Sequence, residues 1–194
     1  MTSKVISILS IDLDYAYSPV IAVYDDFVEG SRISFEAQQD IFEQNSLPTP
    51  TVNPEKLEYM KQLFKAALQA GDVPIVEGEH HHEILKHLEE GALFEIINVD
   101  HHHDILYPGW HEPTELDEGN WVNWLARQNR VVSYTWVRNA DSEDLEPEVE
   151  VKFSYTETEW LDPAVLPQFN LIFVCTSPHW TGAEHLTLRH LLEA

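Results

Sequence analysis

The chain has 194 residues, enough for one domain, residues 1–194, whose hydrophobic core needs no disulfides. Its 34 acidic residues against 11 Lys and Arg give a net charge of −23, which repels phosphate backbones. We therefore expect no nucleic-acid partner and a preference for cationic ligands. The single cysteine, Cys175, excludes a disulfide framework and a Cys-rich zinc site, and its place at the end of an apolar run indicates an inert core thiol.

Residues 1–14 combine one lysine with a short apolar stretch that serines interrupt and two aspartates end. This pattern is typical of a first strand and not of a secretory signal peptide, so we expect a cytoplasmic protein. No apolar run approaches the ~20 residues that a membrane span requires, and we expect no membrane partner.

The first elements are marked by their apolar patterns and caps. Residues 5–13 are apolar at odd and even positions alike, which predicts a strand buried on both faces, and residues 21–28 are a candidate extended segment. Asn53 and Pro54 are typical of a helix N-cap and first position, and Gly71 ends that helix. Its apolar stripe consists of Leu57, Met60, Leu63, Phe64, Ala67 and Leu68.

The rest of the chain continues the alternation of strands and helices. The predicted elements are strands at 73–77, 94–99, 131–137, 149–155 and 170–175, and helices at about 82–90 and 119–129. The acidic stretch 141–148 resembles a hairpin loop, and Thr181 and Glu184 form a capping box for a C-terminal helix. This alternation predicts a three-layer α/β/α domain with a mainly parallel sheet, in which ligands bind beyond the carboxyl ends of the strands.

Three predicted strands end in polar residues that a buried strand does not need. These ends are SIDLD (residues 10–14), VEGEHHH (residues 76–82) and NVDHHHD (residues 98–104). Because the carboxyl ends of parallel strands share one edge of a sheet, these polar residues are candidates for a common site.

The aspartates and histidines of these ends are spaced for metal binding. Alternate residues of an extended chain point the same way, which groups Asp12 with Asp14 and groups Asp100, His102 and Asp104. An extended segment over 100–104 spans about 13 Å, too far for one ion with ~2 Å ligand distances. Either the chain curls directly after the strand, or the ligands serve two ions ~3.5–4 Å apart. Carboxylate and imidazole donors favour Mn²⁺ over Zn²⁺ and Fe²⁺, and such ions offset the mutual repulsion that otherwise raises carboxylate pKa values.

These motifs resemble those of a known group of enzymes. Residues 100–104 match the D-x-H-x-D motif of the arginase and agmatinase ureohydrolases, residues 10–14 match their S-x-D-x-D motif, and residues 78–80 are similar to their G-D-H. The stretches EHHHEIL, VDHHHD, SIDLDY and TSPHWT resemble a small arginase-like family that includes the peptide arginases. The resemblance implies an arginase/deacetylase-like fold. It also implies hydrolysis of arginine side chains of a ribosomal precursor peptide to ornithine and urea.

The resemblance also implies roles for individual residues around two Mn²⁺ ions. Asp12 and Asp100 are shared by both ions, Asp14 and His102 complete one site, and His80 (or its neighbour His81) and Asp104 complete the other. A metal-bridging hydroxide then attacks the guanidinium carbon, and Asp104 holds and deprotonates it. His111, or else His179, protonates the departing amine.

Two departures from ordinary arginases bear on the substrate. Their S-x-D-x-D strand follows the D-x-H-x-D strand, whereas here it precedes it. They also have a glutamate at the late strand end, where this chain has CTSP at 175–178. The residue that holds the guanidinium is therefore unassigned, which favours a peptide-borne arginine over the free amino acid.

Two other interpretations stay open. Residues 100–102 also match the D-H-H signature of two-metal phosphoesterases, although the usual Gly- and Ala-rich continuation is missing, and a one-zinc deacetylase-like enzyme is a variant of this interpretation. In the second, the protein is a non-catalytic module whose His triplets bind metal or a partner. Binding that survives Asp14→Asn would favour the second.

Overall fold

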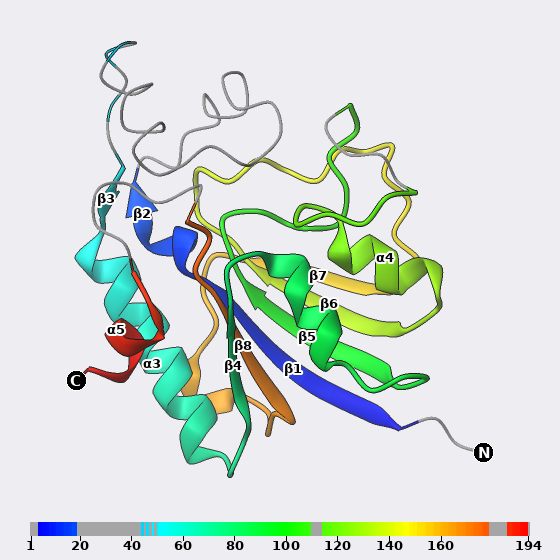
Figure 1. The fold of residues 1–194 in the computed structure, drawn as a ribbon, viewed down its shortest axis with the longest axis horizontal. Coiled ribbons are helices and arrows are strands. Elements are labelled where there is room, and N and C mark those ends of the chain that lie inside the picture. The colour runs from blue at the N-terminus through cyan, green and yellow to red at the C-terminus, as the bar shows by residue number, and fades with distance from the viewer. Residues whose placement is uncertain are drawn as a thin grey trace.

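The structure, a computed structural model, describes residues 4–18, 44, 46, 48, 50–109, 114–178 and 186–193. Within these ranges six strands form a central sheet, and each strand runs parallel to its neighbours. In sheet order they are β4 (Ile75–Gly78), β8 (Leu171–Cys175), β1 (Val5–Asp12), β5 (Leu93–Val99), β6 (Val131–Val137) and β7 (Ser154–Thr158) (Figure 1). A short antiparallel pair, β2 (Tyr17–Ser18) and β3 (Thr51–Val52), forms a second sheet.

β1 lies in the interior of the sheet because it can be buried on both faces. It pairs with β5 on one side and with β8 on the other. Leu9 and Ile11 pack into the hydrophobic cluster on one face of the sheet, and Ile8 packs into the cluster on the opposite face. The predicted strand is thus confirmed, and it ends at Asp12, the residue that begins the polar motif.

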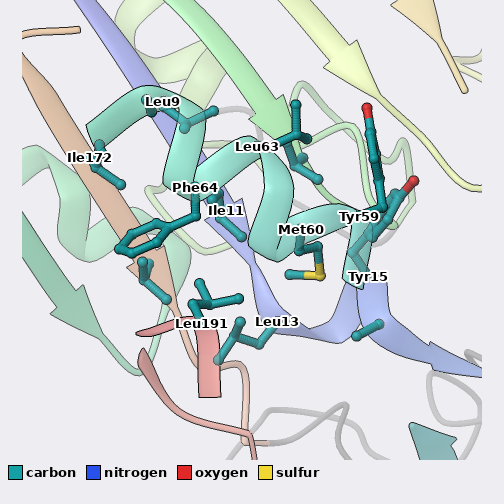
Figure 2. Close-up of a cluster of buried hydrophobic side chains, with 14 of the residues drawn as sticks. Leu9, Ile11, Leu13, Tyr15, Tyr59, Met60, Leu63, Phe64, Ile172 and Leu191 are labelled. Atoms are coloured by element: carbon teal, nitrogen blue, oxygen red, sulfur yellow. The ribbon is translucent and has the colours of Figure 1, made fainter. Parts of the chain in front are cut away.

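Helix α3 (Pro54–Gln69) covers one face of the sheet, together with α5 (Leu188–Leu192) and the 3-10 turn η3 (Pro163–Val165) (Figure 1). The Asn53 side chain caps α3 as predicted, because it accepts hydrogen bonds from the N–H groups of Glu55 and Lys56. The apolar stripe of α3 packs on the sheet, as Figure 2 shows for Met60, Leu63 and Phe64 beside Leu9, Ile11 and Ile172.

The opposite face is covered by the 3-10 helix η2 (His81–His87) and by α4 (Trp121–Arg127). Ile84 of η2 and Trp121 of α4 belong to one buried cluster with Ile8 and Phe173 of the sheet. Helices on both faces of a parallel sheet make the three-layer α/β/α architecture that the sequence predicts. η2 occupies the place of the helix expected over 82–90, but it is shorter and more tightly wound.

The predicted hairpin between the sixth and seventh strands is wrong. β6 and β7 are parallel, and β7 begins at Ser154, later than the predicted strand over 149–155. A parallel pair needs a crossover of a dozen or more residues, and the connection provides it, with Val149 and Val151 packed on the cluster that contains α4. Residues 21–28 and 181–184 lie outside the described residues, and α5 begins after Thr187.

No described helix is both long and apolar enough to cross a membrane. The sheet positions the polar motifs, because β4, β8, β1 and β5 are neighbours and their carboxyl ends meet at one edge. β8 places Cys175 directly between Asp12 of β1 and Gly78 of β4. Residues that follow these strands are therefore within reach of one another.

Candidate metal centre

Asp12 and Asp14 enter the site from a tight turn at the end of β1. The strand continues into a 3-10 helix, η1 (Leu13–Ala16), which Asp12 caps by accepting a hydrogen bond from the Asp14 N–H at 3.0 Å. Ser177 donates a second hydrogen bond, from Oγ to Asp12 Oδ2 at 2.6 Å. Both aspartates are buried, so each carboxylate must be stabilised by protein groups or by a cation in place of water.

The segment after β5 curls as soon as the strand ends, which was one of the two expected alternatives. The His102 N–H donates to Asp100 Oδ1 at 2.8 Å, and Asp104 has a φ of 52°, in the left-handed region that most residues avoid. The curl brings Oδ2 of Asp100 and Oδ2 of Asp104 to within 3.0 and 2.7 Å of the same atom, His81 Nδ1.

His81 is the point at which the three motifs meet. It is only 2% exposed, and its Nδ1 lies 2.7 Å from Asp104 Oδ2, 3.0 Å from Asp100 Oδ2 and 3.3 Å from Asp12 Oδ2. Its Nε2 lies 2.5 Å from Ser10 Oγ. The ring is flanked by those of Trp121 and Phe173, with centroids 5.2 and 5.9 Å away, which fixes its orientation.

His80, which the resemblance implies as a metal ligand, lies outside the cluster, and His81, the stated alternative, takes that place. His80 is the N-cap residue of η2, with an extended backbone, and its Nδ1 lies 2.8 Å from Glu118 Oε2. The next residue is the first of η2 and faces the sheet. The register within the triplet is thus decided by where the 3-10 helix begins.

The ligand atoms form two groups that share Asp100. The first group consists of Asp14, Asp100 and His102, and the second consists of His81, Asp100 and Asp104. Within each group the ligand atoms lie within 4.8 Å of one another. Asp100 turns Oδ1 toward His102 Nδ1, at 3.7 Å, and Oδ2 toward His81 Nδ1, at 3.0 Å. This is the arrangement expected of a carboxylate that bridges two cations.

Two buried polar atoms in these groups indicate that a cation fits. Asp14 Oδ2 and His81 Nδ1 are shielded from solvent and make no hydrogen bond of regular geometry within the described residues. Each instead faces another group of the cluster at ion-pair distance: Asp14 Oδ2 lies 3.0 Å from His102 Nδ1, and His81 Nδ1 lies 2.7 Å from Asp104 Oδ2. An unsatisfied buried donor or acceptor costs about 1–3 kcal/mol. Carboxylate oxygen and imidazole nitrogen are donors that suit Mn²⁺ and related divalent ions. The residues present therefore fit a metal centre.

The charges in the cluster are balanced by retained protons. Burial and the nearby charges of Asp12 and Asp100 raise the pKa of Asp14 to about 7. Burial and Asp100 also raise the pKa of Asp104 well above its ordinary value. Burial alone would lower the pKa of His81, but Asp104 and the other facing carboxylates outweigh it and raise that pKa. Asp14 and Asp104 thus favour the protonated form, and bound cations would replace those protons.

His102 and Asp100 form an opposing pair. Burial disfavours the charged form of His102, yet the carboxylates of Asp14 and Asp100 raise its pKa well above the ordinary value. Burial would raise the pKa of Asp100, but hydrogen bonds with His102 and His81 lower it well below the ordinary value. Asp100 therefore ionises before Asp14 and Asp104, in keeping with its place in both groups.

Other side chains hold the carboxylates in position. Trp121 Nε1 donates to Asp104 Oδ2 at 2.7 Å, and Asn98 Nδ2 donates to Asp100 Oδ2 at 3.1 Å. The Trp136 indole N–H donates to the backbone oxygen of Asp100 at 3.0 Å. The sequence gives no local signal for the two tryptophans, because their contacts cross from α4 and β6 to the segment after β5.

Cys175 is a further residue that the sequence did not assign to the site. With Asp12 and His81 it makes a third group whose ligand atoms lie within 4.8 Å of one another. Its burial agrees with the interpretation as a core thiol. The signal that could have found it is its place at the end of a predicted buried strand, where the other site residues also lie.

The proposed proton donors, His111 and His179, lie outside the described residues. Another histidine near the cluster is described: His101 is buried, with Nδ1 3.3 Å from Asn139 Nδ2. Burial and the neighbouring His102 lower the pKa of His101 to about 3, so this ring stays neutral at physiological pH.

No model of a known protein family matches the sequence, and neither a curated protein nor a solved structure matches the chain. What the chain does is therefore inferred from its own residues. The buried cluster of aspartates and histidines can bind metal, and it is compatible with a metal-dependent hydrolase.

Proposed function

We propose that the protein is a manganese-dependent peptide arginase. In this proposal it binds two Mn²⁺ ions per chain and hydrolyses arginine side chains of a precursor peptide to ornithine and urea. The observation that carries it is the sharing of Asp100 between two ligand groups, with one oxygen toward His102 and the other toward His81. Two cations that share a carboxylate are the arrangement used for hydrolysis by activated water.

The reaction requires three events at the guanidinium. Bound divalent cations would lower the pKa of water to near neutral and polarise the group under attack. An oxygen–carbon bond forms from water, the bond between the carbon and the side-chain nitrogen breaks, and that nitrogen leaves with a proton as the ornithine amine. Asp104 is suited to take the proton of the water, because its carboxylate is held in position by the hydrogen bond of 2.7 Å from Trp121 Nε1 to Asp104 Oδ2. His111 is the proposed donor to the amine.

Charge and the motif resemblance support a guanidinium substrate. A net charge of −23 attracts a cation and disfavours the phosphate esters of the alternative hydrolases. At the end of β8, where arginases have a glutamate, the described residues Cys175, Thr176 and Ser177 offer no carboxylate. The carboxylate that arginases have at this position is thus missing from the site, and we propose a peptide-borne arginine as the substrate in place of free arginine.

Mass spectrometry of arginine-containing peptides incubated with the protein and Mn²⁺, with urea measured in parallel, tests the proposal. We expect the mass change of arginine to ornithine and an equal amount of urea, both lost in Asp100→Asn. Asp72→Asn, an exposed aspartate outside the cluster, is the matched control and should retain activity. Absence of ornithine in every peptide, although two ions are bound, would refute the proposal. Release of phosphate from phosphodiesters, or of amine from acylated lysine, would then assign one of the alternative hydrolases.

A further inference from the structure

Ser10 is a polar residue inside a buried strand of the sheet. It lies in β1, it is completely buried, and its Oγ lies 2.5 Å from His81 Nε2. A buried hydroxyl without a hydrogen bond is destabilising, and this contact provides one. Ser10 belongs to the SIDLD motif, but the proposed reaction does not use its hydroxyl. The contact joins Ser10 to a member of the second ligand group, which consists of His81, Asp100 and Asp104.

The two nitrogens of the His81 ring have different surroundings. Nδ1 lies between 2.7 and 3.3 Å from carboxylate oxygens of Asp104, Asp100 and Asp12. On the other side of the ring, Ser10 Oγ is the hydrogen-bond partner described for Nε2. A neutral imidazole carries its proton on one nitrogen, and the other nitrogen offers the lone pair that binds a metal. A cation among the carboxylates contacts Nδ1, so the ring proton must then be on Nε2.

The aromatic neighbours of His81 fix the plane of its ring but not which edge faces the carboxylates. Trp121 and Phe173 lie beside the ring, with interplanar angles of 31° and 20°. Rotation by half a turn about the Cβ–Cγ bond keeps the plane but exchanges Nδ1 with the carbon Cδ2, so that the carboxylates would face a C–H group. Apolar rings do not distinguish these two orientations. Ser10 does, because only one of them places Nε2 beside its Oγ.

We propose that Ser10 is a positioning residue that selects the metal-binding form of His81. Its Oγ accepts a hydrogen bond from the Nε2–H group, which turns the Nδ1 lone pair toward the cation position of the second group. Such a bond at the outer nitrogen of a ligating histidine fixes its tautomer and its ring orientation. A hydroxyl does so without adding negative charge to the four buried carboxylates. The inference deepens the proposed function and rests on it only for the presence of a cation beside His81.

NMR of the protein with ¹⁵N-labelled histidine and bound ¹¹³Cd²⁺ tests the proposal independently of activity. Cd²⁺ is a divalent ion close to Mn²⁺ in size, and the ¹¹³Cd nucleus couples directly to the nitrogen that binds it. For His81 in the wild type we expect this coupling at Nδ1, together with a slowly exchanging proton on Nε2. Coupling at Nε2, or a His81 ring without coupling in the cadmium-saturated protein, would overturn the proposal. This decisive measurement needs only the wild type.

Variants of Ser10 supply a second measurement. Ser10→Ala removes the hydroxyl that distinguishes the two ring edges, so we expect metal affinity to fall about 10–100-fold and the coupling at Nδ1 of His81 to weaken or move. Ser10→Thr keeps the hydroxyl and should retain the coupling. Ser7→Ala, the same substitution on the opposite face of β1, is the matched control and should bind metal as the wild type does. Undiminished affinity and unchanged coupling in Ser10→Ala would contradict the inference.

Failure of the proposed function has a different signature. A protein that hydrolyses no peptide but binds Cd²⁺ through Nδ1 of His81 keeps the inference and refutes the reaction. A protein that produces ornithine while Cd²⁺ couples to Nε2 keeps the reaction and loses the inference.

Discussion

Trp121 Nε1 donates a hydrogen bond of 2.7 Å to Asp104 Oδ2. The same oxygen lies 2.7 Å from His81 Nδ1, so the indole holds the carboxylate where the cluster needs it. Trp121 is completely buried on α4, and Asp104 sits at a positive φ of 52°. The helix on one face of the sheet thus fixes a residue whose own backbone is strained.

Trp121→Phe is expected to weaken metal binding or turnover by about 10–100-fold, the usual effect of removing a hydrogen bond to a metal ligand. The benzyl ring keeps most of the apolar packing, so the fold should survive. Metal affinity from calorimetry and kcat for ornithine formation measure the effect. Trp124→Phe on the same helix is the matched control, since Trp124 has no described contact with the cluster. An equal loss in both variants would show that the effect comes from helix packing.

Alanine variants of the neighbouring residues His80 and His81 test which histidine of the first triplet binds metal. His81→Ala is expected to lose one cation per chain and all turnover, because Nδ1 of His81 faces three carboxylates. His80→Ala is expected to keep both cations, because His80 pairs with Glu118 outside the cluster. Metal content measured by mass spectrometry of the desalted protein decides between them. Loss of metal in the His80 variant alone would reverse the assignment.

Metal should stabilise the folded protein. A ligand at 100 times its Kd adds about 2.7 kcal/mol per site to the free energy of unfolding, provided that it binds only the folded state. We therefore expect Mn²⁺ to raise the Tm of the wild type and to leave the Tm of Asp100→Asn nearly unchanged. Asp72→Asn should respond as the wild type does. Thermal unfolding with and without a chelator provides the measurement, and equal shifts in all three proteins would place the bound metal elsewhere.

Metal affinity should fall as the pH falls through about 7, the pKa to which burial and the neighbouring carboxylates Asp12 and Asp100 raise Asp14. Below this pH Asp14 holds a proton that a cation must displace, and above it the carboxylate is ready to bind. Each displaced proton changes the affinity about tenfold per pH unit. Calorimetry in buffers with different ionisation enthalpies measures both the affinity and the protons released. A pH-independent affinity between pH 6 and 8 would contradict the assignment of Asp14 as a ligand.

The sequence predicts the parts of the site that depend on local pattern. Asp12 and Asp100 are found because each stands at the end of a strand whose apolar residues are evident. The choice between His80 and His81 depends on where a 3-10 helix begins, and three identical residues carry no signal for it. The hairpin prediction failed because a polar acidic loop looks the same whether the next strand returns antiparallel or crosses over.

The supporting residues could not be predicted for a related reason. Ser10 bonds to His81 across 71 positions of sequence, and Ser177 bonds to Asp12 across 165. Such pairs are decided by the order of strands in the sheet, which a single sequence does not specify. Alternation of strands and helices was sufficient for the fold class, but the position of β8 between β1 and β4 was not predictable from it.

That position of β8 imposes an order on assembly. Among the described residues β8 is the last strand in chain order, yet it is inserted between β4 and β1. Before β8 is in place, β4 and β1 have no strand between them to hold them two strand spacings, ~10 Å, apart. Nothing then positions His81, which follows β4, next to Asp12 at the end of β1. We expect a growing chain that lacks β8 to hold His81 away from the carboxylates that follow β1 and β5, and to bind a cation weakly at the group of His81, Asp100 and Asp104. A cation would then enter the group that contains His81 only when the sheet is complete, so that loading of this group marks the end of folding.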